Sequence, residues 1–202
     1  MPMQSMIFDL LRKNYYGPIN AYKEPAPVKR EKPFVLWIGC PDAPAAAISK
    51  LDWEKGKVLT YNRPANQINP DDPDFLNMLR YAIEVKEIQK IIVCGYSGCG
   101  SGAEVMAALK KNRVVEGQSA ACYRLAMEHI DLLDQIPDEG DKAKTLSCLN
   151  VLETVRQLQM LQKNIPGLRK VEIVPLVLDG ASDLLINPDT ALARRCVTIG
   201  NE

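Results

Sequence analysis

The sequence predicts an α/β fold: a mostly parallel, open sheet of four to five strands flanked by helices. Two short apolar runs, at 34–40 (FVLWIGC) and 90–95 (KIIVCG), end at glycine-containing turns and have the unbroken apolar character of strands buried on both faces. Two further strand candidates lie at 57–62 (KVLTYN) and 171–179 (VEIVPLVLD). Helical patterns alternate with these runs, and such alternation favours parallel strands with helices on both faces.

Helices predicted from apolar spacing lie between the strands, at 73–87, 102–112, 118–135 and 144–163. The last strand contains Pro175, which cannot donate a hydrogen bond to a neighbouring strand. We therefore expect Pro175 to lie near an edge of the sheet or at a bulge.

The N-terminal residues differ in character from the rest of the chain. Residues 4–14 have helical apolar spacing, and the segment that follows is broken by three prolines. We expect a helical arm and an extended linker over residues 1–33, followed by one domain over residues 34–202. A helix as short as this arm is not stable alone, so we expect it to pack against another surface.

Composition limits the classes of function. The 202 residues are 47% hydrophobic and contain no run of eighteen uncharged apolar residues, which indicates a globular protein with a full core. Lysine plus arginine number 25, as do aspartate plus glutamate, so no net charge attracts nucleic acid or an anionic membrane. The first residues lack the features of a secretory signal, and six cysteines are too few for a disulfide scaffold. We expect a cytoplasmic protein whose partner is a small molecule or another protein.

Two cysteines follow two of the predicted strands: Cys40 comes after the first run, and Cys99 lies in the turn after the second. In open α/β sheets the ligand crevice lies outside the carboxyl ends of the strands, so both thiols can converge there. Thiolates suit zinc, and a catalytic zinc site has three protein ligands, of which Asp42 offers the third. The alternative is that both are ordinary buried cysteines, since free cysteine is among the most buried residue types.

The same two turns carry a resemblance to the β-class carbonic anhydrases, in particular to their bacterial and plant-like members. That family has Cys-x-Asp-x-Arg after a strand, where this chain has LWIGC followed by PDAP, and His-x-x-Cys in a second turn, where this chain has CGYSGCG. The two cysteines are 59 residues apart, as in the family, and further colinear matches include NRPAN at 62–66 and LNVLETVRQL at 149–158. The resemblance spans roughly residues 4–186 and is too extensive for chance.

The resemblance implies a zinc ion held by Cys40, Cys99 and the residue at position 96. It also implies that Asp42 either binds the metal in a closed form or pairs with an arginine at position 44. In the open form, a zinc-bound hydroxide attacks carbon dioxide to give bicarbonate, because the metal lowers the pKa of bound water from about 15.7 to about 7. The family's N-terminal arm packs across a partner subunit, which implies a homodimer or a higher homo-oligomer here.

Three departures from the family pattern concern its chemistry. Tyr96 stands where the family has its histidine ligand, and a phenol with a pKa of about 10 binds zinc only after deprotonation. Pro44 replaces the arginine that would orient Asp42. The family's RNxAN reads NRPAN here, so Asn62 occupies the usual arginine position and Arg63 the usual asparagine position.

In some bacterial relatives that arginine, a tryptophan matching Trp37 and a downstream tyrosine hold an inhibitory bicarbonate. Trp37 is present here, but the last strand offers no matching tyrosine. We expect the pocket to be formed by Trp37, Gly39, Asn62 and Arg63. His129, the only histidine, lies in a helical pattern away from both turns, which predicts a helix-surface or interface residue rather than a ligand or proton shuttle.

These departures favour a pseudo-enzyme, a carbonic-anhydrase fold kept for a structural, regulatory or ligand-binding role, with an active carbonic anhydrase or another protein as a candidate partner. Without metal we expect neutral thiols at Cys40 and Cys99, and a hydrogen bond to Asp42 from the Tyr96 hydroxyl or from its own turn. The alternative is an enzyme that uses Cys40, Asp42 and Cys99, either a zinc-dependent carbonic anhydrase or a related small-molecule hydrolase or lyase. Zinc content separates these two hypotheses.

Overall fold

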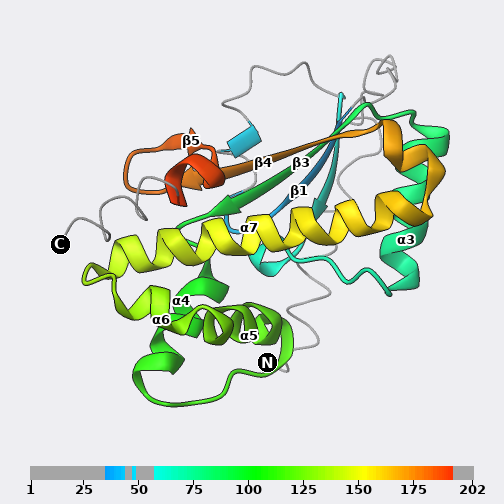
Figure 1. Cartoon of the computed structure of the whole chain (residues 1–202). Coiled ribbons are helices and arrows are strands. Elements are labelled where there is room, and N and C mark those ends of the chain that lie inside the picture. The colour runs from blue at the N-terminus through cyan, green and yellow to red at the C-terminus, as the bar shows by residue number, and fades with distance from the viewer. Residues whose placement is uncertain (1–34, 44–46, 49–56, 193–202) are drawn as a thin grey trace, which may run out of the picture. The chain divides into compact units, whose positions relative to one another are not determined.

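The computed structural model describes residues 35–43, 47–48 and 57–192. Five strands form one sheet in the order β2–β1–β3–β4–β5 (Figure 1). Their bounds are β1 Val35–Gly39, β2 Val58–Asn62, β3 Lys90–Tyr96, β4 Glu172–Asp179 and β5 Leu184–Ile186. Strand β1 pairs in parallel with β2 and β3, β3 pairs in parallel with β4, and β5 runs antiparallel to β4. The expected α/β fold with a mostly parallel sheet is confirmed, whereas the expected N-terminal arm lies outside the described residues.

The helices follow the strands much as their apolar spacing predicts. The α-helices are α3 Pro73–Arg80, α4 Gly100–Lys110, α5 Ala120–Glu128, α6 Ile130–Asp134 and α7 Glu139–Asn164. Shorter helical segments are η2 Pro64–Asn66, η3 Tyr81–Val85 (a π-helix that continues α3), η4 Gly117–Ser119 and η5 Pro166–Lys170. The helix predicted at 118–135 is divided at His129, and α7 begins five residues before its predicted start. Its start is set by Asp138, whose side chain accepts the Asp141 backbone N–H at 2.8 Å.

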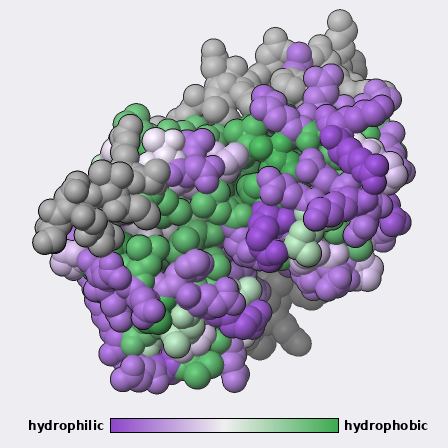
Figure 2. Space-filling model, viewed as in Figure 1, coloured by the Kyte–Doolittle hydropathy of each residue, from purple (hydrophilic) through white to green (hydrophobic). Residues whose placement is uncertain are grey.

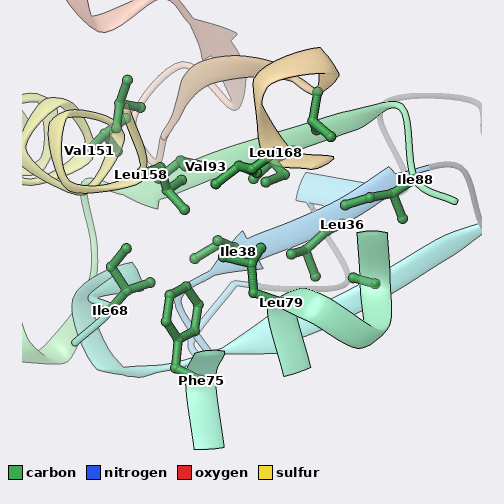
Figure 3. Close-up of a cluster of buried hydrophobic side chains, with 14 of the residues drawn as sticks. Leu36, Ile38, Ile68, Phe75, Leu79, Ile88, Val93, Val151, Leu158 and Leu168 are labelled. Atoms are coloured by element: carbon green, nitrogen blue, oxygen red, sulfur yellow. The ribbon is translucent and has the colours of Figure 1, made fainter. Parts of the chain in front are cut away.

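One face of the sheet is covered by both α3 and α7. Side chains of β1 and β3 pack there against Phe75 and Leu79 of α3 and against Val151 and Leu158 of α7 (Figure 3). Full burial of a side chain such as Phe75 contributes roughly 1.5–3 kcal/mol to folding. On the opposite face, Trp37 and its neighbours pack against the described residue Ala47. Helices α3 and α7 therefore share one face of the sheet, and α7 runs past the strand ends (Figure 1).

Pro175 lies near a sheet edge, as expected. Strand β4 pairs with β5 only at its last three residues, 177–179, so in the described part of the chain Pro175 has a neighbouring strand on the β3 side alone. Strand β5 was not expected from the sequence, because three residues are too short for a periodic pattern.

The surface is mixed in polarity. On the face viewed in Figure 2, hydrophilic residues cover much of the surface, and apolar residues are visible in smaller areas between them. Among the described residues, no helix has the length and apolar character needed to cross a membrane.

Candidate functional site

The two thiol turns meet because their strands are neighbours. Cys40 directly follows β1, Cys99 follows β3, and these strands pair in parallel with Gly39 opposite Cys94. The two Sγ atoms lie 2.9 Å apart, at hydrogen-bond distance, and both side chains are buried. The structure thus brings together the two cysteines that the sequence singled out.

Asp42 completes a group of three potential metal ligands. One ligand atom from each of Cys40, Asp42 and Cys99 lies within 4.8 Å of the other two. The Asp42 Oδ2 atom is 3.7 Å from the Cys40 Sγ atom and accepts the Gly100 backbone N–H at 2.6 Å. We expected this carboxylate to bond to Tyr96 or to its own turn. It instead bonds to the first residue of α4, because the free N–H groups at a helix N-terminus attract an anion.

Tyr96 is a packed aromatic residue at the edge of this group. Its ring contacts the buried cluster that contains Cys40 and Cys99 and also the cluster that contains Trp37. A side chain at position 98 would clash with this ring, since its Cβ atom would lie 2.8 Å from the hydroxyl oxygen. Glycine at position 98 therefore allows the phenol to fold back over its own turn.

The four expected pocket residues do not act as one group. The buried Trp37 indole lies over Gly39, where any Cβ atom would overlap it, and the Asn62 Oδ1 atom is 3.3 Å from the same point. The Trp37 Nε1 atom has no hydrogen-bond partner among the described residues. Arg63 is exposed and contacts Tyr61: its Nε donates to the Tyr61 hydroxyl at 3.1 Å, and its guanidinium lies 5.5 Å from the centre of the Tyr61 ring.

The two thiols of the pair differ in the direction of their pKa shifts. The pKa of Cys99 is lowered to about 6, first because the Cys40 thiol donates a hydrogen bond to it and further because backbone N–H groups of Gly102, Ser101 and Ala65 face it, although burial opposes this. The pKa of Cys40 is raised, because its proton is held by Cys99 and because burial disfavours a thiolate. Cys99 is therefore the more acidic thiol of the pair, because it lies at the start of α4 and faces backbone N–H groups there.

The donor set fits a zinc ion. Two thiolates and one carboxylate provide three protein ligands of the types that zinc accepts, and leave a fourth position open. Zinc–sulfur bonds of about 2.3 Å in a tetrahedral site place two sulfurs roughly 3.8 Å apart. The sulfurs, now at 2.9 Å, would have to separate by about 0.9 Å, whereas the 3.7 Å between Cys40 and Asp42 needs little change. His129 stands apart, at the junction of α5 and α6.

Asp42 also borders a cleft of about 450 Å³. Among the described residues, the lining includes the carboxylates of Asp42, Glu104 and Glu116 but no lysine, arginine or histidine. The Ser119 hydroxyl donates to the Glu104 carboxylate at 2.7 Å beside the cleft. The described lining of the cleft beside Asp42 is therefore acidic.

A polar stripe on α7, which sequence reasoning did not single out, holds the turns around the site. The stripe consists of Lys144, Ser147, Asn150 and Thr154, whose spacing of three, three and four residues places them on one helix face. The sequence contained one signal of this stripe: polar residues at helical spacing inside an otherwise apolar helical pattern. The turn that Asn150 and Thr154 contact is strained, because its residues Ala65 and Asn66 have φ angles of 54° and 45°. Such a left-handed conformation costs roughly 1–2 kcal/mol for a residue with a Cβ atom.

Known proteins with similar sequences are carbonic anhydrases. The family model described as carbonic anhydrase matches residues 35–179. A carbonic anhydrase of Candida albicans is 32% identical over 149 residues, which are 71% of this chain and 51% of that protein. A carbonic anhydrase of Emericella nidulans is 29% identical over 63% of this chain and 56% of that protein. The chain thus spans about half the length of the curated relatives it matches.

Solved structures agree on the fold. One of two tetrameric β-carbonic anhydrases from Sordaria macrospora superimposes with a TM-score of 0.65 at 22% identity, covering 91% of this chain and 96% of that chain. The β-carbonic anhydrase CafD of Aspergillus fumigatus gives a TM-score of 0.64 at 25% identity, covering 80% of this chain and 92% of that chain.

Proposed function

Because the chain belongs to the β-carbonic anhydrase family, we propose that it is a catalytically impaired member, a pseudo-enzyme with a structural, regulatory or ligand-binding role. The observation that carries this proposal is the position of Asp42. Its carboxylate lies beside the thiol pair and is held there by the Gly100 N–H at 2.6 Å. Residue 44 is a proline, which has no side-chain donor to draw the carboxylate away.

Charge around the site supports the same proposal. A bound zinc would supply Lewis-acid chemistry, but two thiolates and a carboxylate would more than neutralise its charge and weaken its effect on water. The arginine nearest to the family's usual position is engaged with Tyr61 instead of facing the thiols. The acidic cleft beside Asp42 repels bicarbonate, the anion that carbon dioxide hydration produces.

The zinc-dependent carbonic anhydrase is the second candidate. It is favoured by the clustering of Cys40, Asp42 and Cys99, since these side chains are of the right type and number to hold zinc. A related hydrolase or lyase for another small molecule would use the same three residues.

The two candidates are separated by measuring zinc content and activity on the same preparation. The full chain is purified without chelator, its zinc is counted by elemental analysis, and carbon dioxide hydration is followed by stopped flow. We expect a rate no faster than that of a chelator-treated control, whether or not zinc is present. Fast hydration that chelator abolishes would overturn the pseudo-enzyme proposal in favour of the enzyme.

We further propose a cytoplasmic homo-oligomer assembled through the N-terminal arm, with another carbonic anhydrase as a candidate partner. Support comes from the relative in Sordaria macrospora, which is tetrameric. Size-exclusion chromatography of the full chain at micromolar concentration tests this, because a monomer there would contradict it. Adding an active relative to the same experiment tests the second partner.

A further inference from the structure

The polar stripe of α7 contacts the last residues of β4 and β3 and the segment that follows β2. Lys144 donates to Asp179 at the end of β4, at 2.7 Å. The Ser147 hydroxyl donates to the carbonyl oxygen of Tyr96 at the end of β3, at 3.1 Å. Asn150 and Thr154 then reach the segment after β2, so one helix face contacts the ends of β4, β3 and β2 in turn.

The last of these contacts is a buried clamp on η2. The Asn150 side-chain amide donates to the carbonyl oxygen of Ala65 and, at 3.2 Å, to the side-chain oxygen of Asn66. The Thr154 hydroxyl donates to the carbonyl oxygen of Asn66 at 3.3 Å. Gln67 closes the group, because its amide donates to the Asn150 Oδ1 atom at 3.2 Å. Asn66, Asn150 and Thr154 are each less than 5% exposed.

This clamp acts on a segment that borders the thiol pair. Ala65 packs in the same buried cluster as Cys40 and Cys99, and a small pocket is lined by Ala65, Asn66, Cys99 and Asn150 together. Both Ala65 and Asn66 have left-handed φ angles, which an unrestrained chain would leave. The conformation therefore needs partners that hold it. Besides the local bond from the Asn66 N–H to the Arg63 carbonyl oxygen at 2.8 Å, it has the side chains of Asn150 and Thr154 on α7.

We propose that Asn150 and Thr154 are positioning residues that hold the strained 65–66 turn against the Cys40–Cys99 pair and so fix the geometry of the two sulfurs. The clamp acts through the backbone of Ala65 and Asn66 and touches neither sulfur directly. The inference rests on the proposed function in placing the ligand site at this thiol pair. The test of this inference uses metal-free protein. The inference can therefore fail while the proposed function stands, and the proposed function can fail while the inference stands.

The test compares two threonines of α7 that undergo the same chemical change. Thr154→Val removes the hydroxyl that donates to Asn66, whereas Thr145→Val removes a buried hydroxyl that has no partner in the described part of the chain. Amide hydrogen exchange of the full, metal-free chain is measured for residues 64–67 and for the helices. The rate at which N-ethylmaleimide modifies Cys40 and Cys99 is measured in parallel by peptide mass spectrometry.

We expect Thr154→Val to speed exchange at 64–67 by about twofold to tenfold, the effect of losing one net hydrogen bond, and to raise the modification rate of both cysteines. Thr145→Val should leave exchange at 64–67 and both modification rates unchanged, and Thr154→Ser, which keeps the hydroxyl, should restore the wild-type values. Asn150→Ala should give the Thr154→Val pattern more strongly.

Two results would overturn the proposal. One is equal exchange at 64–67 in the Thr154→Val and Thr145→Val proteins. The other is faster exchange in the Thr154→Val protein spread evenly over all helices, because that indicates loss of global stability alone. Should Asn150→Ala fail to fold, the threonine pair decides the question.

Discussion

The ion pair between Lys144 and Asp179 gives a prediction about stability and its dependence on pH. Asp179 ends β4, is 5% exposed, and accepts hydrogen bonds from Lys144 Nζ and the Ser182 hydroxyl, both at 2.7 Å. Burial alone would raise the pKa of Asp179, but these bonds and the Ala181 N–H together lower it. Replacing the carboxylate by an amide, in Asp179→Asn, removes the ion pair with little change in shape.

The expected loss follows from the surroundings of the pair. A hydrogen bond to a charged group contributes about 1.5–3 kcal/mol. Because the Lys144 side chain is 27% exposed, solvent screens part of this, and we expect a loss of about 2 kcal/mol at pH 7. For a chain of this length that corresponds to a fall in Tm of roughly 4–8 °C, measured by circular dichroism or calorimetry.

The sign of the pH dependence is fixed by the direction of the pKa shift. A carboxylate with a lowered folded-state pKa stabilises the protein above its unfolded pKa of about 3.9, and this contribution disappears as the pH falls through the folded value. The Tm difference between wild type and Asp179→Asn should be full at pH 5–7 and shrink below about pH 4. Glu172→Gln is the matched control, because it breaks an exposed ion pair with Lys90 on the same sheet and should cost no more than about 0.5 kcal/mol. Equal Tm values for Asp179→Asn and wild type at pH 7, or a difference unchanged at pH 3, would refute this reasoning.

Further predictions concern the site, the core and the assembly. The double variant Tyr96→His with Pro44→Arg should bind one zinc per chain by elemental analysis, because it restores an imidazole ligand and a cation for the nearby carboxylate; sub-stoichiometric zinc after zinc-supplemented growth would contradict this. Thr145→Val should be neutral or raise the free energy of unfolding by about 1 kcal/mol in urea, since the buried hydroxyl has no partner among the described residues, and a clear loss would disprove that account. Deletion of residues 1–27 should lower the apparent mass in size-exclusion chromatography, and an unchanged mass would exclude a role of the arm in assembly.

The sequence predicts the central strands well because their signal is purely local. Strands β1 and β3 are buried on both faces, so each appears as an unbroken apolar run, and their parallel pairing alone brings Cys40 near Cys99. The partner of Asp42 could not be predicted in the same way. Its bond to Gly100 depends on how two turns from different strands approach each other, which no residue pattern records.

The clamp on η2 was missed for a related reason. Asn150 and Thr154 lie inside a long helix that is otherwise mostly apolar on its buried side, and isolated polar residues there have no local partner. Their hydrogen-bond partners are more than 80 residues away in the chain. Only the packing of α7 across the strand ends explains why these buried polar groups are satisfied.

The order of arginine and asparagine at positions 62 and 63 is reversed relative to the family pattern, and this small change in sequence alters the site. Successive residues of an extended strand point to opposite faces, so moving an arginine by one position moves its guanidinium to the other side. Asn62, opposite Gly39 in the register, keeps its side chain near the Trp37 indole. Arg63 shares a face with Tyr61, two residues earlier, and its Nε bonds to that hydroxyl at 3.1 Å. The described residues on the Trp37 side thus have an amide where the family pattern implies a cation, and an anion bound there would lack its main counter-charge.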